Sequence, residues 1–329
     1  MKNSLTLALI PFLLMNLASA KSLIIGGEVV AEKSPLAQSV VSLVDLNGPE
    51  IEEFCTGTIV SPRVILTATH CLEREFFLPF KVAYGTSSRT AKLYEVQGVK
   101  LNLQNYYQKL WRMDGWSAID VAIILLKEPI EGNILTIKSP KDYDLSRPIR
   151  QVGFGCRSAL CEEDATAKDF GELYKLDTNV ISEIQGTLIK VTEFAESRSA
   201  AGDSGGPLLT SENEILGVVS SGFVEPEAYA NYAAPYFFIN WMNCALPADS
   251  QIKVSNQPLT EQVECDGVPL TDYHDLMTMR RKQCQDQLPG FDIVNGDCFP
   301  NNEKTCVEES ARYPDRGLIW NPQNNSCEY

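Results

Sequence analysis

The sequence has few of the residues that hold structural metals. Only two histidines, His70 and His274, occur in 329 residues, and none of the ten cysteines belongs to a Cys-x-x-Cys pair. Structural zinc sites usually combine four cysteine or histidine ligands, often with paired cysteines at that spacing. We therefore expect no bound metal and no other cofactor.

Basic residues are also scarce. The chain has 28 Lys and Arg against 43 Asp and Glu, which gives a formal net charge of −15. Such a balance argues against nucleic acid or an anionic membrane surface as a partner, because both repel an acidic protein. A solvated acidic surface is sufficient to explain the charge.

Long apolar runs are absent except near the N-terminus. An apolar run from residue 5 to residue 15 follows Lys2, and the small residues 18–20 (Ala-Ser-Ala) match a signal-peptidase site. The run is too short to span a membrane and is interrupted by Pro11. We expect a signal peptide at residues 1–20, no membrane span, and a protein secreted to the extracellular space or the periplasm.

The most informative stretch is Ala-Ala-Gly-Asp-Ser-Gly-Gly-Pro, residues 200–207. A serine between small residues on a tight turn exposes its hydroxyl, and successive N–H groups there can bind a developing oxyanion. Spacing alone fits a Gly-rich hairpin equally well. The longer string, however, resembles the nucleophile loop of chymotrypsin-like (trypsin-fold) serine proteases. The resemblance implies that Ser204 is the nucleophile and that the amides of Gly202 and Ser204 form the oxyanion hole.

A second motif is Thr-Ala-Thr-His-Cys, residues 67–71, which follows two short β-branched runs. A lone histidine is more often packed or solvated than catalytic. This motif resembles the general-base motif of the same family, which implies that His70 is the base. The family pattern also implies a disulfide between Cys55 and Cys71.

Asp120 opens an apolar run, residues 121–126. An acidic residue in this place is ordinarily a solvated charge at the edge of a strand. The run resembles the family's Asp-Ile-Ala-Leu-Leu strand, which implies that Asp120 orients the imidazole of His70. The order His70, Asp120, Ser204 is that of chymotrypsin-like enzymes.

The string Ile-Ile-Gly-Gly, residues 24–27, resembles the family's mature N-terminus. There the freed ammonium pairs with the aspartate before the nucleophile, which implies that Ile24 pairs with Asp203 on activation. Taken alone, the string fits a strand that begins with a Gly-Gly turn. Leu23 stands where the family has Arg or Lys, so a trypsin-type activator does not fit. Residues 21–23 are the expected short propeptide.

The family pattern assigns Arg198, Ser220, Gly222 and Ala230 to substrate binding. Arg198 at the floor of the primary pocket disfavours Lys and Arg side chains and favours acidic ones. Ala200 replaces a cysteine that usually braces this pocket with a disulfide. The unbraced loop leaves open the alternative that Arg198 points into solvent.

The fold predicted for residues 24–246 is all-β. Short apolar runs alternate with Gly, Pro, Asn and Asp, and helical periodicity first appears at residues 236–246. The resemblance implies two six-stranded antiparallel β-barrels with a C-terminal helix and the active site between the barrels.

Residues 247–329 have no counterpart in the protease pattern and contain five cysteines. We expect a small disulfide-rich C-terminal module with an unknown ligand. Cys156 and Cys161 are close enough in sequence to pair with each other. Cys244 then requires a partner in the C-terminal extension if every cysteine is oxidised.

The sequence therefore predicts a secreted serine endopeptidase that hydrolyses peptide bonds of a protein or peptide substrate through an acyl-enzyme. An alternative from another class is an adhesin or carbohydrate-binding protein whose protease domain is inactive or auxiliary.

Overall fold

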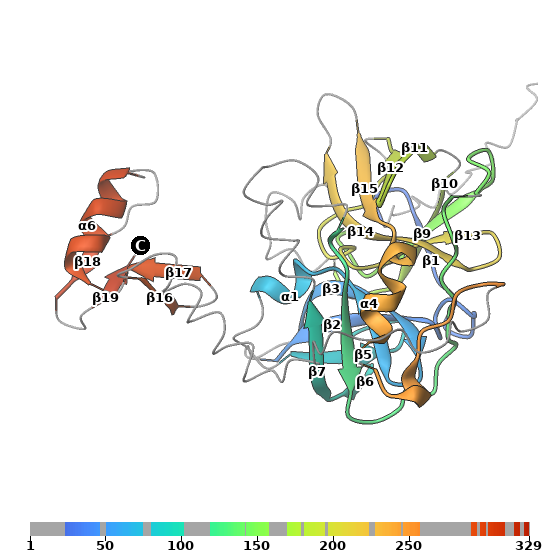
Figure 1. Ribbon diagram of the computed structural model, residues 1–329, viewed down its shortest axis with the longest axis horizontal. Coiled ribbons are helices and arrows are strands. Elements are labelled where there is room, and N and C mark those ends of the chain that lie inside the picture. The colour runs from blue at the N-terminus through green and yellow to red at the C-terminus, as the bar shows by residue number, and fades with distance from the viewer. Residues whose placement is uncertain are drawn as a thin grey trace, which may run out of the picture.

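The computed structural model describes two antiparallel β-sheets, a short closing helix and a group of C-terminal elements (Figure 1). The described residues are 24–46, 51–74, 80–101, 119–141, 143–157, 170–178, 181–194, 197–223, 228–244, 246–256, 291–294, 297–300, 302–312, 319–322 and 326–328. The predicted signal peptide and propeptide lie outside these ranges.

The first sheet has the strand order β6-β5-β2-β3-β4-β8-β7. Its strands are β2 (Val40–Asp45), β3 (Glu52–Ser61), β4 (Val64–Thr67), β5 (Phe80–Tyr84), β6 (Lys92–Tyr94), β7 (Val96–Leu101) and β8 (Ala122–Leu126). Only Glu95 separates β6 from β7, yet β6 pairs with β5 at one edge and β7 pairs with β8 at the other. One stretch of chain thus joins both edges and closes the sheet into a barrel.

The second sheet has the order β1-β10-β9-β13-β14-β15-β12-β11. Its strands are β1 (Glu28–Val29), β9 (Ile149–Gly153), β10 (Tyr174–Thr178), β11 (Ile181–Gln185), β12 (Leu188–Thr192), β13 (Pro207–Thr210), β14 (Ile215–Phe223) and β15 (Tyr229–Ala233). Here β10 and β11 follow one another and pair near opposite edges, with β9 and β12. If β6 is counted together with β7, and β10 together with β11, each barrel has six strands, and β1 is added to the second. The predicted architecture is confirmed.

The central strands of the first barrel form because their apolar runs are short and rich in branched aliphatic residues. Every residue of β4 and of β8 is buried, as expected for continuous apolar runs of strand length. The largest core cluster also includes Val152, Leu209 and Val218 from the second barrel. The two barrels therefore pack against each other through a shared core.

A 3-10 turn, η2 (Pro235–Phe238), leads into the closing helix α4 (Ile239–Asn243). The predicted helix at residues 236–246 is confirmed in this shorter form. Beyond it, η3 (Ala248–Ser250) follows, Ile252 joins the shared core and Val254 forms a β-bridge with Ile137. The chain thus continues to pack on the barrels past residue 246.

The C-terminal elements comprise two hairpins and a helix. They are β16 (Phe291–Val294), β17 (Asp297–Pro300), α6 (Glu303–Arg312), β18 (Ile319–Asn321) and β19 (Ser326–Glu328). Helix α6 contacts β17, β18 and β19, and it carries the buried, disulfide-bonded Cys306. The expected small disulfide-rich module at residues 247–329 stays a prediction.

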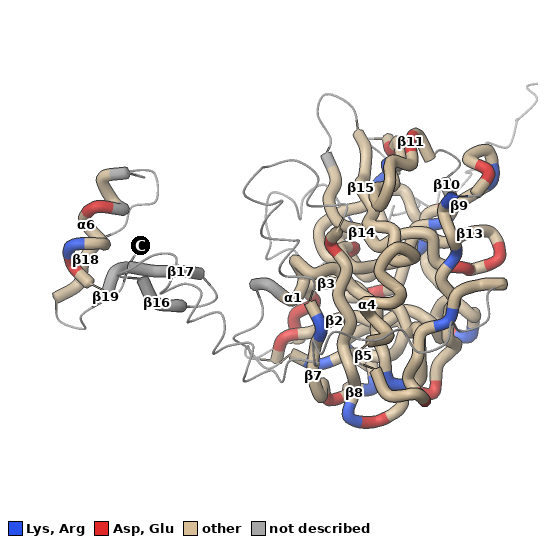
Figure 2. The backbone as a smooth tube through the Cα atoms, in the orientation of Figure 1, with Lys and Arg blue, Asp and Glu red and all other residues tan. Residues whose placement is uncertain are grey.

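Charged side chains of both signs are distributed over the described chain. Figure 2 shows Lys and Arg interspersed with Asp and Glu, mainly at the turns of the barrels. Within the described ranges no helix has the length and apolar character needed to cross a membrane.

Candidate active site

His70 and Asp120 meet because their strands are neighbours. Thr67, the last residue of β4, pairs with Ala122, the first residue of β8. His70 lies three residues after Thr67, and Asp120 lies two residues before Ala122. Both side chains therefore emerge at the same end of an antiparallel pair.

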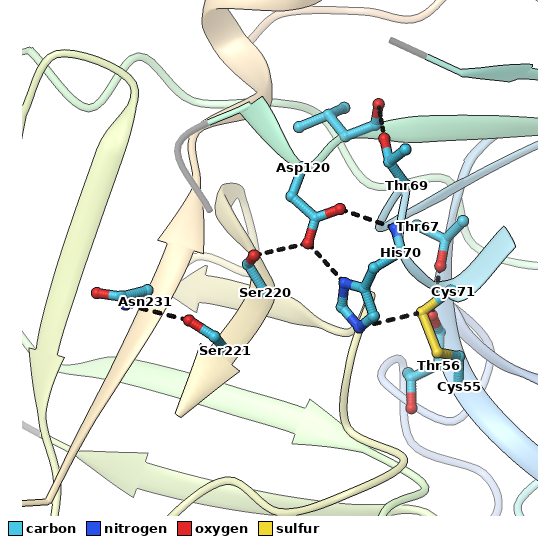
Figure 3. A network of polar contacts seen from close by, with 11 residues as sticks. Cys55, Thr56, Thr67, Thr69, His70, Cys71, Asp120, Ser220, Ser221 and Asn231 are labelled. Carbon is cyan, nitrogen blue, oxygen red and sulfur yellow. Dashed lines mark hydrogen bonds and ion pairs between the residues drawn. A yellow bond between two sulfur atoms is a disulfide. The ribbon is translucent and has the colours of Figure 1, made fainter. Parts of the chain in front are cut away.

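The Asp120 carboxylate is completely buried and accepts three hydrogen bonds (Figure 3). The His70 backbone N–H donates to Oδ1 at 2.9 Å, and the His70 Nδ1 lies 2.6 Å from Oδ2. Ser220 Oγ, from β14 of the second barrel, donates to Oδ2 at 2.6 Å. A buried carboxylate with this many donors favours the tautomer that carries its proton on Nδ1 and leaves Nε2 as an acceptor.

The histidine segment is fixed on both sides. Thr69 Oγ1 donates to the Val121 carbonyl at 2.9 Å, and the disulfide between Cys55 and Cys71 joins β3 to the start of α1 (Cys71–Arg74). The predicted disulfide is therefore present. The sulfur atoms of Cys55 and Cys71 lie within 4.8 Å of a His70 ring nitrogen, but sulfurs bonded to each other are not thiolate ligands for a metal.

The nucleophile loop is held against β3 by Thr56, the residue after Cys55. The Thr56 N–H donates to the Ser204 carbonyl at 2.8 Å, and Thr56 Oγ1 donates to the Gly202 carbonyl at 2.8 Å. Gly205 has a φ of 81°, and a Cβ on it would lie 2.3 Å from the Thr56 carbonyl oxygen and 3.1 Å from the Ala68 nitrogen. Only glycine permits this approach, which brings the loop beside the segment that carries His70.

Ser204 itself is half-buried. Among the described residues, no hydrogen bond joins its hydroxyl to His70, a bond that is often long when no substrate is bound. The backbone N–H groups of Gly202 and Ser204 donate to no acceptor within the described part of the chain. Two neighbouring unpaired amides are what an oxyanion site requires.

Comparison with known proteins agrees with this geometry. Residues 24–242 match the family model described as Trypsin. The chain belongs to the trypsin family of serine endopeptidases. It is 25% identical over 272 residues to spermosin of Halocynthia roretzi, covering 75% of this chain but only 66% of that relative.

Two further relatives match this chain over shorter stretches than spermosin does. The cercarial protease of Schistosoma mansoni is 28% identical over 191 residues, which cover 52% of this chain and 72% of that protein. A trypsin of Sarcophaga bullata is 26% identical over 228 residues, which cover 64% of this chain and 86% of that protein.

Asp203, the residue before Ser204, is buried, and no cation lies beside it among the described residues. Its oxygens accept hydrogen bonds from the N–H groups of Gly155 and Ala200, each at 2.9 Å. Burial raises the pKa of Asp203 to about 7; the two N–H donors oppose this shift, and the charge of Glu193 adds to it. A Cβ on Gly153 would lie 2.2 Å from Asp203 Oδ1, so the carboxylate requires a glycine there.

Among the described residues, no hydrogen bond or ion pair joins Ile24 to Asp203. Ile24 is buried against Tyr174 and Leu176 and has a φ of 38°, which is unusual for a β-branched residue. Its neighbour Ile25 accepts a hydrogen bond from the backbone N–H of Arg198 at 2.9 Å. The Ile24 segment thus lies on the loop that leads to Asp203.

The residues assigned to substrate binding lie together. Gly222 pairs with Ala230 across β14 and β15, and a Cβ on Gly222 would lie 3.5 Å from Ser199 Oγ. Arg198 is 5% exposed, and its Nη1 donates to the Ser199 carbonyl at 3.2 Å. The side chain of Arg198 therefore faces the interior, and the alternative that it points into solvent is wrong. The fourth of these residues, Ser220, donates its hydroxyl hydrogen bond to Asp120.

Glu193 also lies in this cluster, with only 6% of its surface exposed, and was not predicted from the sequence. It follows β12 and precedes an exposed phenylalanine, Phe194. No motif marks it, and a single acidic residue at the end of a strand is ordinarily solvated. The small residues around Ser199, which Glu193 contacts, are the one sequence feature among the described residues that could have indicated a buried partner for it.

The other predictions about disulfides involve some cysteines that lie outside the described residues. Cys156 and Cys244 are both disulfide-bonded. Cys161 and the pairing Cys156–Cys161 also lie outside them. The pairing of Cys244 with the C-terminal extension stays a prediction.

Proposed function

We propose that this protein is a secreted endopeptidase in which Ser204, His70 and Asp120 form the catalytic triad. The hydrogen bonds of the buried Asp120 are the observation that carries the proposal. They hold the His70 ring with Nδ1 toward the carboxylate, which leaves Nε2 to act as a base toward Ser204.

In the first half-reaction, the Ser204 oxygen attacks the carbonyl carbon of the scissile peptide bond and its proton passes to His70 Nε2. The carbonyl oxygen becomes an oxyanion, which the N–H groups of Gly202 and Ser204 stabilise. The intermediate collapses, the C–N bond breaks, and the imidazolium returns its proton to the leaving amine. An acyl-enzyme ester on Ser204 remains.

In the second half-reaction, water replaces the amine. His70 Nε2 accepts a proton from the water as its oxygen attacks the ester carbon. The second tetrahedral intermediate collapses, the proton passes to Ser204, and a carboxylic acid product leaves. Throughout, Asp120 stays ionised and stabilises the imidazolium.

Reaction with a fluorophosphonate probe tests this mechanism, because only a serine activated by a base reacts quickly. We expect the active wild-type enzyme to be labelled at Ser204 and the Ser204→Ala variant to remain unlabelled. Ser211→Ala is the matched control, since Ser211 is an exposed serine of the second barrel. Equal labelling of Ser204→Ala and wild type would refute the assignment.

The proposal includes export and activation. The signal-like residues 1–20 support secretion, and the string at residues 24–27 supports a mature chain that begins at Ile24. A freed Ile24 ammonium would supply the cation that Asp203 lacks among its described contacts. We accordingly divide the chain into a signal peptide (1–20), a propeptide (21–23), a protease domain (24–246) and an extension (247–329) with an unknown ligand.

We propose that cleavage does not follow Lys or Arg. The guanidinium of Arg198 is buried at the assigned floor of the primary pocket, where it repels a cationic side chain. A profile of the bonds cleaved in a peptide library tests this. A preference for bonds after Lys or Arg would contradict the assignment of Arg198 to the pocket floor.

An adhesin or carbohydrate-binding protein with a silent protease domain was the alternative. The C-terminal hairpins and helix are compatible with a binding module, but no described contact identifies a ligand for them. The intact pairing of His70 with Asp120 supports an active protease instead, and the labelling experiment separates the two functions.

A further inference from the structure

Glu193 is tied to the nucleophile loop by side-chain hydrogen bonds. Its Oε1 accepts from the backbone N–H of Ser199 at 2.9 Å, and its Oε2 accepts from Ser199 Oγ at 3.2 Å. Ser199 lies only five residues before Ser204 in the sequence. Glu193 therefore fixes both the backbone and the side chain of a residue at the start of the loop.

Glu193 is itself anchored to the wall of the second barrel. Its Oε1 also accepts a hydrogen bond from Gln151 Nε2, on β9, at 2.8 Å. Its backbone N–H donates to the Ala228 carbonyl at 2.9 Å, next to the start of β15. Glu193 thus connects Ser199 to β9 through its carboxylate, while its backbone is bonded next to the start of β15.

Two consecutive amides of the loop are held by two different buried carboxylates. Glu193 accepts from the Ser199 N–H, and Asp203 accepts from the Ala200 N–H. Beyond these amides the loop presents the N–H groups of Gly202 and Ser204. The orientation of the proposed oxyanion hole therefore depends on how firmly the Ser199–Ala200 peptide is fixed.

We propose that Glu193 is a positioning residue for the oxyanion hole, and that its hydrogen bonds to Ser199 brace the loop where Ala200 has replaced a disulfide cysteine. The inference rests on the proposed function of Ser204, because an oxyanion hole matters only if that serine is acylated. It adds a residue that neither the motifs nor the family match assigns.

The bracing depends on the hydrogen bonds of Glu193 more than on its charge. Burial raises the pKa of Glu193, and the three hydrogen bonds and the charge of Arg198 oppose this shift. Among the described residues, no ion pair joins Glu193 to Arg198. Glutamine at position 193 preserves every contact, because its oxygen accepts from Ser199 N–H and Gln151, and its NH₂ donates to Ser199 Oγ.

The experiment compares Glu193→Ala, Glu193→Gln and Glu193→Asp in the full-length, activated enzyme. Glu183→Ala is the matched control, since Glu183 is an exposed acid on β11 of the same barrel. Active sites are titrated with a fluorophosphonate, and kcat and KM are expressed per titrated site. The inhibition constant for a peptide boronate, which forms a tetrahedral adduct, is measured in parallel with that of the corresponding peptide product.

We expect Glu193→Ala to lower kcat by about 10- to 100-fold per titrated site, because losing one oxyanion donor outright costs about 10²- to 10³-fold. The boronate should bind more weakly by a similar factor, while KM and product binding change by less than about threefold. Glu193→Gln should stay within about threefold of wild type. Glu193→Asp, which keeps the charge but shortens the reach, should resemble Glu193→Ala.

Several results would overturn the inference. One is a kcat per titrated site in Glu193→Ala equal to that of wild type, which would show that Glu193 contributes only to the stability of the fold. Another is a Glu193→Gln variant as impaired as Glu193→Ala, which would make the charge the essential feature. If Glu193→Ala does not fold, the contrast between Glu193→Asp and Glu193→Gln decides in the same way. A wild-type enzyme that neither reacts with the probe nor cleaves peptides would instead refute the proposed function.

Discussion

The two halves of the candidate site are fixed by different chemistry. The half that carries His70 is held by a covalent bond, the disulfide between Cys55 and Cys71. The half that carries Ser204 has Ala200 where the family pattern implies a cysteine, and buried carboxylates hold its backbone by hydrogen bonds. A covalent brace persists in any folded state of the oxidised chain, whereas a hydrogen-bonded one depends on the positions of the donors and acceptors that form it.

The two buried aspartates show the same contrast. Asp120 has an imidazole and a hydroxyl beside it as well as a backbone amide. Among the described residues, Asp203 accepts hydrogen bonds from the backbone amides of Gly155 and Ala200 alone, and its pKa is raised to about 7. Within this described part of the chain, the buried carboxylate of the His70 half thus has an imidazole partner, while that of the Ser204 half has no cationic partner.

The largest effect should come from removing either member of the reacting pair. Ser204→Ala and His70→Ala should each lower kcat by about 10⁶-fold, and the double variant should be no worse, because the two groups act as a unit. Steady-state kinetics of the activated enzymes measure this. Additive losses would show that the two halves act independently and would contradict the triad.

Asp120→Asn should have the next largest effect, a loss of about 10⁴-fold in kcat with the fold intact. The NH₂ of an asparagine can donate to an unprotonated Nδ1, and its oxygen accepts from a protonated Nδ1 less strongly than a carboxylate does. The tautomer with its proton on Nε2, which cannot act as a base toward Ser204, therefore becomes populated. Kinetics and a thermal melt of the same sample distinguish this from unfolding. A loss below tenfold would exclude Asp120 from orienting His70.

Much of this arrangement was predictable because it depends on short, contiguous motifs. The residues around His70 and Ser204 predicted both the barrels and the roles proposed here. The break between β6 and β7 was not predictable, because nothing in the residues around Glu95 distinguishes a strand that changes partners from one that ends.

Glu193 was not predictable for a different reason. Its burial arises from contacts with Gln151 and Ser199, which lie 42 and 6 residues away. A single acidic residue in a polar context has no local pattern that reports such long-range contacts. The orientation of Arg198 was open for the same reason, since a short loop allows either direction until its neighbours are placed.

The third prediction concerns Asp203 in the chain that still carries residues before Ile24. An unfolded aspartate ionises near 3.8, while the folded one has a pKa of about 7. Between these values the folded state holds a proton that the unfolded state has lost, so the free energy of unfolding falls as the pH rises from about 4 to about 7. The difference of about 3 pKa units corresponds to about 4 kcal/mol. Denaturant titrations at pH 5 and pH 8 measure the larger part of this fall, about 3 kcal/mol.

Asp203→Asn is the control for this pH dependence, because its side chain does not titrate. We expect the fall between pH 5 and pH 8 to disappear in that variant. It should also be much smaller in a chain that begins at Ile24, whose ammonium stabilises the ionised carboxylate. Terminal sequencing of the active enzyme is the companion measurement, and an active chain that begins at Lys21 would contradict the proposed activation.

The smallest effect should come from removing the covalent brace. The disulfide joins residues 16 positions apart, a loop for which the chain-entropy estimate is about 3 kcal/mol. The double variant Cys55→Ser, Cys71→Ser should lose about this much unfolding free energy but keep Asp120 bound to His70, because the bonds of Thr69 and Asp120 to this segment do not involve sulfur. Its kcat per titrated site should therefore fall by less than about tenfold, less than we expect for Glu193→Ala. A larger loss of kcat than in Glu193→Ala would reverse the comparison, because it would show that the covalent brace, and not the hydrogen-bonded one, sets the geometry of the reacting groups.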